Sequence, residues 1–148
     1  MSRIKIDLPQ QFSFTASPAV RITDINYGNH VGNDSILSLL HEARMQFLHH
    51  FGYTEMNFGG VGMIMRDVNI EFKKEIFYGD QLRIGVAAGA FTSVAFDLYY
   101  KVEKKTGEKL ITAVAARTGM VCFDYSRNKI VAIPEAAKFA LASVSVEL

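Results

Sequence analysis

The residues best suited to chemistry lie in one short polar segment, residues 20–33, which runs directly into an apolar stretch. Its side chains include a carboxylate, an amide and an imidazole, at Asp24, Asn26 and His30. A helix that begins where the segment ends would present unpaired backbone N–H groups and partial positive charge. Such a helix start suits a polarised carbonyl or a phosphate, so the segment predicts an oxyanion site.

The donors of this oxyanion site are expected to be backbone N–H groups near Gly32 and Asn33. Attack on the carbonyl carbon also needs a carboxylate, as nucleophile or as the base that activates water. Asp24 and Glu42 are the two candidates for it. For Asp24 the alternative is to cap the turn, and for Glu42 it is a structural role on the helix. Asp34 is expected to be a helix N-cap instead.

The four histidines, all between residues 30 and 50, raise the question of a metal site. His41, His49 and His50 do not place two ligands four residues apart with a third group in support, so no metal is predicted. His30 either orders its loop by hydrogen bonds or transfers a proton, and the first interpretation is favoured.

Composition bounds the class of protein. The chain has 148 residues, which predicts one domain over residues 1–148 with a core that needs no disulfide. A net charge of +1 argues against a nucleic-acid surface, and no apolar run is long enough for a membrane span. The first seven residues lack the apolar core of a signal peptide, so a cytoplasmic location is expected. The single cysteine, Cys122, lies in an apolar run and is expected to be buried.

The elements that would position the polar segment follow from periodicity. Apolar residues recur every three or four positions over residues 35–51, which predicts a long helix with a wide buried face that ends near Gly52. Alternating patterns predict strands at about 12–22, 68–73, 81–88, 93–103 and 110–123. Residues 58–62 are expected to form a flexible loop, and a short helix is expected over 134–142.

These elements predict an α+β fold in which an antiparallel sheet wraps around the long helix. Such a sheet leaves an edge or an apolar face that a second copy of the chain can cover. We therefore expect a homodimer.

The chain resembles the hot-dog fold acyl-CoA thioesterases, most closely the 4-hydroxybenzoyl-CoA thioesterase-like branch. Three stretches, within a similarity that extends roughly over residues 12–140, carry the resemblance. They are Asp24-Ile25-Asn26-Tyr27-Gly28-Asn29-His30-Val31-Gly32-Asn33, His41-Glu42-Ala43-Arg44 and the strand sequence of residues 71–82.

This resemblance implies hydrolysis of an acyl-CoA thioester between subunits of a dimer or tetramer, with coenzyme A as part of the substrate and no separate cofactor. It implies that Tyr27 and residues 58–63 line an acyl pocket, although loop packing explains them equally well. Arg66, Lys73 and Lys74 are candidates to meet the phosphates of coenzyme A, and ordinary strand-surface charge is the alternative.

The chain also departs from the family pattern. Asn26 stands where the family has its catalytic aspartate, Gly32 where asparagine is usual, and His41 where a first glutamate is common. An amide cannot act as a carboxylate base, so Asn26 is expected to position the water or the substrate. Either the protein then uses another carboxylate, or it is a weak or inactive member of the family. The alternative function is a non-catalytic hot-dog protein that binds acyl-CoA or an acyl carrier. A hydratase is a third possibility, but its histidine and aspartate pairing on the central helix is not found here.

Overall fold

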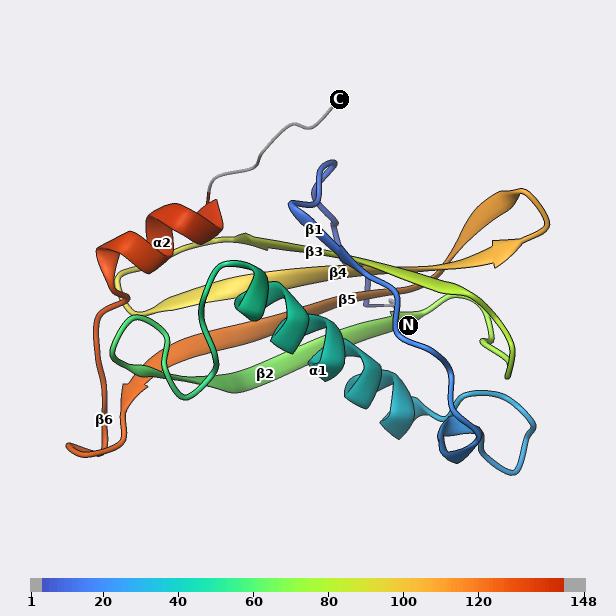
Figure 1. The fold of residues 1–148 in the computed structure, drawn as a ribbon, viewed down its shortest axis with the longest axis horizontal. Helices are drawn as coiled ribbons and strands as arrows, with labels where there is room; N and C mark the ends of the chain where they lie inside the picture. Colours follow the sequence, from blue (N-terminus) through green and yellow to red (C-terminus); the bar gives the residue numbers. More distant parts are fainter. Residues whose placement is uncertain (1–3, 143–148) are drawn as a thin grey trace.

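A computed structural model describes residues 4–142 as six strands, two α-helices and one 3-10 turn (Figure 1). In chain order the elements are β1 (Phe14–Ala16), η1 (Ile22–Asp24), α1 (Asn33–His50), β2 (Gly62–Phe72), β3 (Leu82–Gly89), β4 (Ala95–Thr106), β5 (Lys109–Asp124), β6 (Lys129–Ile130) and α2 (Glu135–Ala142).

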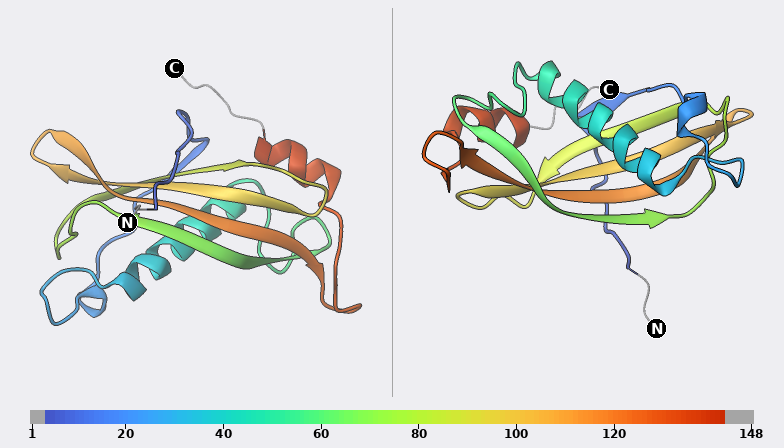
Figure 2. Two further views of the ribbon diagram at one scale, coloured as in Figure 1. Left: turned by 180° about the vertical axis from the view of Figure 1, so that it is seen from behind. Right: turned by 90° about the horizontal axis from the view of Figure 1, so that it is seen from below.

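All strand pairings are antiparallel, in the order β1-β3-β4-β5-β2, and β6 pairs with the end of β5. The helix α1 crosses one face of this curved sheet, as the view from below in Figure 2 shows. Residues of the N-terminal segment lie on the opposite face, where Ile4–Asp7 border Tyr99 and Arg117. The predicted α+β arrangement is therefore confirmed.

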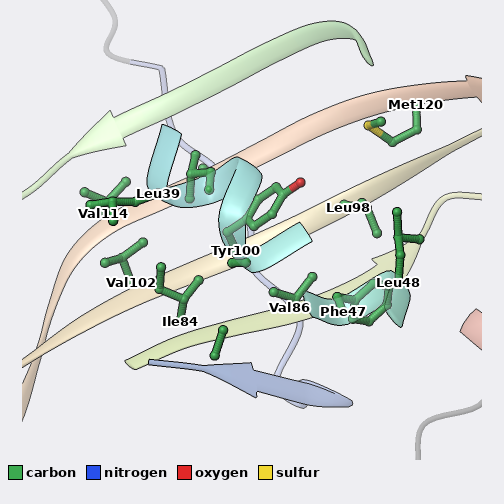
Figure 3. Close-up of a cluster of buried hydrophobic side chains, with 14 of the residues drawn as sticks. Leu39, Phe47, Leu48, Ile84, Val86, Leu98, Tyr100, Val102, Val114 and Met120 are labelled. Carbon is green, nitrogen blue, oxygen red and sulfur yellow. The ribbon is translucent and has the colours of Figure 1, made fainter. Parts of the chain in front are cut away.

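The core forms between α1 and the concave face of the sheet, and Figure 3 shows its central side chains. The predicted helical stripe is buried because its apolar residues recur on one face. Leu40, Ala43, Phe47 and Leu48 have no exposed area. The sheet contributes the side chains that alternate inward, among them Ile84, Val86, Leu98, Val102 and Met120.

The two ends of this core differ. At one end α2 packs beside β3, with Ala137 and Leu141 buried in the core. A side chain at Gly59 would come within 3.2 Å of Pro134, so the loop after α1 also packs closely against the start of α2. The N-terminal end of α1 points away from α2 (Figure 1).

Several predicted boundaries were wrong. The first strand covers only Phe14–Ala16, since Pro18 removes a backbone donor and the chain then turns through η1. β2 begins at Gly62 rather than near residue 68, and it contains an irregularity between Met65 and Asp67 that interrupts the alternation. Four other elements, β3, β4, β5 and α2, lie where they were predicted. Their ends agree with the prediction within two residues, except for the end of β4.

One buried polar chain crosses the core beneath α1. Arg44 is only 4% exposed, and its Nη1 donates to the Tyr100 hydroxyl at 3.2 Å. The hydroxyls of Tyr100 and Thr118 share a hydrogen bond of 2.7 Å. On the other side, Glu55 lies 3.7 Å from Arg44 Nε and accepts a 2.6 Å hydrogen bond from His41 Nε2. Burial raises the pKa of Tyr100, which keeps its hydroxyl protonated.

No helix within residues 4–142 is long and apolar enough to cross a membrane. Cys122 is fully buried, as predicted, and burial raises the pKa of its thiol to about 11.

Candidate active site

The candidate site begins at the 3-10 turn, where Asp24 has a structural role. Asp24 is 4% exposed, and its Oδ2 accepts a 2.8 Å hydrogen bond from the Arg21 backbone N–H. Its Oδ1 accepts a 3.4 Å hydrogen bond from the Arg21 guanidinium. Both carboxylate oxygens are therefore occupied, and the geometry is that of the turn cap which the sequence left open as an alternative to catalysis.

Asn26 holds the next turn in place. Its Oδ1 accepts hydrogen bonds from the backbone N–H groups of Gly28, at 2.9 Å, and His30, at 3.4 Å. Between them Asn29 has a φ of 64°, a left-handed conformation that asparagine tolerates better than most residues. Because the side-chain oxygen is used inside the turn, the amide nitrogen faces the start of α1, on the side of Gly32.

His30 is half-buried, and its Nδ1 donates to the Val31 carbonyl at 3.1 Å. In the neutral imidazole this bond leaves Nε2 as an acceptor. The contact orders the loop, in line with the interpretation favoured from sequence.

Of the two predicted donors at the start of α1, the N–H of Asn33 has no partner among the described residues and that of Gly32 is already used. Gly32 is the N-cap, and its N–H already donates to the Asp24 carbonyl at 3.0 Å. The first helical hydrogen bond runs from Ile36 N to Gly32 O, so the N–H groups of Asn33, Asp34 and Ser35 have no partner among the described residues. Asp34 was expected to be the N-cap, and this was wrong because the helix begins one residue before it.

A cavity of about 170 Å³ opens beside this helix start. The Val31 N–H donates to the Ile76 carbonyl at 2.8 Å, which fixes the segment after β2 against the end of the loop. The cavity lies between this segment and α1, with an apolar floor from Ile36 and Val114. Its polar rim consists of His30, Asn33, Lys73, Lys74 and Glu75.

The structure brings together only part of the predicted site. His30, Asn33 and Lys73 line the cavity, and Asn26 and Gly32 adjoin it through the loop. Tyr27 is fully exposed at the loop tip, and Arg66 is exposed near the irregularity of β2; neither lines the cavity.

Glu42 also lies apart from the cavity. It is exposed, accepts a hydrogen bond from Gln46 Nε2 at 3.0 Å, and borders a separate groove between α1 and residues 18–21. The helical spacing alone could not distinguish this outer face from the face toward the helix start.

Two carboxylates at the helix start were missed as candidates for chemistry. Asp34 is exposed beside Gly32, and Glu75 is exposed at the cavity rim. Neither carboxylate has a hydrogen bond or an ion pair with another described residue. Asp34 was assigned to capping, and Glu75 carried no signal because it follows two lysines at the end of a strand.

Among residues 4–142 there is no group of three or more histidine, cysteine, aspartate or glutamate side chains that could hold an ion.

The cavity beside the helix start combines unpaired N–H donors with two lysines and the free carboxylate of Glu75, while Asp34 stands next to Asn33 outside the cavity lining. The donors can hold a carbonyl oxygen as it gains negative charge. Lysines at the rim can attract a phosphate group.

The chain is similar to known proteins in sequence and in fold. A 1,4-dihydroxy-2-naphthoyl-CoA hydrolase from Microcystis aeruginosa is 27% identical over 113 residues, which cover 74% of this chain and 79% of the relative. A solved 1,4-dihydroxy-2-naphthoyl-CoA thioesterase from Synechocystis is 20% identical and superposes with a TM-score of 0.77, over 88% of this chain and 96% of that one.

A 4-hydroxybenzoyl-CoA thioesterase variant, solved in complex with 4-hydroxybenzoyl-CoA, superposes with a TM-score of 0.78 at 17% identity, over 86% of this chain and 97% of that one. These two superpositions confirm the hot-dog fold. The model of the thioesterase-like superfamily matches residues 20–141. Since this match spans most of the sequence, the chain belongs to the thioesterase-like superfamily.

Proposed function

We propose that this protein is an acyl-CoA thioesterase, which hydrolyses its substrate to a free acid and coenzyme A. The observation that carries the proposal is the start of α1, where unpaired N–H groups from Asn33 onward adjoin a cavity with Lys73 and Lys74 at its rim. Membership of the thioesterase-like superfamily supports the same reaction.

In this proposal the thioester oxygen lies against the Asn33 N–H, which stabilises the negative charge that develops during attack by water. The side chains of Lys73 and Lys74 meet the phosphates of coenzyme A. Coenzyme A is part of the substrate, and no cofactor is proposed.

A homo-oligomer, dimer or tetramer, is part of the proposal, because β2 is a long strand paired on one side only. Within the described residues it pairs with β5 and leaves its other edge unpaired. Met65 and Phe72, on the face of β2 toward α1, are 36% and 51% exposed. Exposed edges of this length commonly pair with another chain, and Phe72 also lines the cavity. A second copy on β2 would therefore complete the cavity wall.

The relatives act, by their names, on aromatic acyl-CoA thioesters, so aromatic acyl groups come first in the panel to be tested. We propose a cytoplasmic location, with which a free, buried cysteine is compatible.

The test is release of coenzyme A, followed with a thiol reagent, from aromatic, short-chain and long-chain acyl-CoA thioesters. Hydrolysis of at least one class supports the proposal. Binding of a non-hydrolysable analogue without any turnover would contradict it and favour a binding protein.

The double substitution Lys73→Ala/Lys74→Ala should raise KM several-fold with little change in kcat, since the phosphates lie far from the reacting carbon. The matched control is Lys105→Ala/Lys109→Ala, which removes two exposed lysines at the β4–β5 turn. If both double variants raised KM equally, Lys73 and Lys74 would not be part of the coenzyme A site.

A further inference from the structure

We propose that Asp34 is the carboxylate that activates water in this reaction, and that Gly32 is glycine in order to make room for it. The inference rests on the thioesterase function proposed above. It assigns a catalytic residue where the resemblance alone leaves an asparagine.

The other carboxylates near α1 are occupied or remote. Asp24 is buried with both oxygens bonded to Arg21. Glu42 faces the separate groove beside residues 18–21. Asp34 stands in the first turn of α1, beside the unpaired N–H groups that would hold the thioester oxygen, and its carboxylate has no partner among residues 4–142.

Gly32 shows why the carboxylate can lie there. Its φ of −70° and ψ of 156° form an extended conformation that any residue adopts, so the backbone does not require glycine. A Cβ atom at this position would lie 2.6 Å from Asp34 Oδ1, which is closer than van der Waals contact allows. The absent side chain therefore leaves the space that the carboxylate occupies.

Asn26 borders the same space. Its Cβ and Nδ2 lie 3.5 Å and 3.8 Å from the point where a Gly32 Cβ would be. The hydrogen bonds from Gly28 and His30 to Asn26 Oδ1 turn the amide N–H₂ toward this point. An amide donor and a carboxylate that both border this point beside Gly32 can together orient one water molecule.

In the reaction, an Asp34 oxygen takes a proton from water while the water oxygen forms a bond to the acyl carbon. The thioester oxygen, held by the Asn33 N–H, carries the negative charge until the C–S bond breaks. The protonated Asp34 then gives its proton to the sulfur of the leaving coenzyme A. One thioester and one water are converted to one acid and one thiol, and Asp34 returns to its carboxylate form.

The first experiment compares Asp34→Asn with wild type on the best substrate of the panel. Loss of a general base should lower kcat by about 100-fold or more, with KM changed by less than about threefold. Glu135→Gln, which removes an exposed first-turn carboxylate from α2, should leave kcat unchanged. Glu75→Gln tests the free carboxylate at the rim of the cavity.

The second experiment keeps the Asp34 residue but displaces its carboxylate. Gly32→Ala should lower kcat by about 10-fold to 100-fold while the melting temperature stays near that of wild type, because only the end of a flexible exposed side chain must shift. In the double variant Gly32→Ala/Asp34→Asn, the alanine should cost nothing further, since the base that it displaces is already gone.

The outcomes separate this inference from the function on which it rests. A wild-type protein that hydrolyses no thioester overturns both. An active wild type whose Asp34→Asn variant keeps its kcat overturns the role of Asp34 and leaves the function standing. If kcat falls in Glu75→Gln and not in Asp34→Asn, Glu75 is the residue that activates water. If the effects of Gly32→Ala and Asp34→Asn on kcat add up in the double variant, Gly32 does not make room for the Asp34 carboxylate.

Discussion

Arg44 and Tyr100 meet inside the core, 56 positions apart in the sequence, through a hydrogen bond of 3.2 Å from the guanidinium to the phenol. The Arg44 guanidinium thereby lies inside a largely apolar core, between α1 and the sheet. Because Tyr100 also bonds Thr118, the contact joins α1 to β4 and β5 at a defined position.

Tyr100→Phe should lower the free energy of unfolding by about 1–3 kcal/mol, because it leaves the Thr118 hydroxyl and an Arg44 N–H buried with one partner fewer. Urea denaturation measures this change. Tyr99→Phe is the matched control on the outer face, where the hydroxyl makes only a 3.5 Å contact with Asp97. Equal losses in both variants would argue against a special role for the buried hydroxyl.

Arg44→Ala should cost about 3–5 kcal/mol of unfolding free energy, since it leaves a cavity and removes the guanidinium that lies 3.7 Å from Glu55. Arg44→Met should recover part of this loss, because the methionine side chain fills the space without a buried charge. Arg83→Ala, on an exposed position of β3, should change stability by less than about 0.5 kcal/mol. If Arg44→Ala were as mild as Arg83→Ala, the buried guanidinium would contribute little.

Cys122 should not react with a thiol reagent near pH 8 in the folded protein, because it has no exposed area and its pKa is raised to about 11. A thiol-based assay would therefore report coenzyme A alone, whereas one equivalent of thiol should appear after denaturation. Rapid labelling of the native protein would show that this part of β5 opens.

The same thiol makes stability depend on alkaline pH. The ordinary thiol pKa of 9.0 applies to the unfolded chain. The contribution of Cys122 to the free energy of unfolding is therefore fully present below pH 9 and is lost as the pH rises toward the folded-state pKa of about 11. Over that interval the unfolded chain releases a proton that the folded one retains, which costs about 1.4 kcal/mol per pH unit. In Cys122→Ala this part of the alkaline slope should disappear, and a slope equal to that of wild type would assign it to other groups.

Asn26→Ala should lower kcat by about 10-fold, because the turn loses the acceptor for the Gly28 and His30 N–H groups and the start of α1 is held less firmly. Asn26→Asp keeps an acceptor oxygen at the same place and adds a carboxylate, so hydrolysis should match or exceed that of wild type. Steady-state kinetics on the two variants checks both expectations. An inactive Asn26→Asp would show that the amide N–H₂ itself is required.

Periodicity predicted the helix and the central strands because each buries one face, and burial repeats at the period of the element. The polar segment of residues 20–33 likewise leads into the start of α1, where we propose the site. Periodicity could not show on which side of α1 Glu42 lies, because a wide apolar stripe does not fix how the helix is rotated about its axis. The meeting of Arg44 with Tyr100, and of Asp34 with the space at Gly32, depends on folding of the whole chain.

The position of α2 has a consequence for engineering of the molecule. Since this helix lies at the end of the core opposite the start of α1, a change on its exposed side is distant from the proposed site. A surface anchor attached on the exposed side of α2 would therefore leave the proposed approach of a thioester to Asn33 unobstructed.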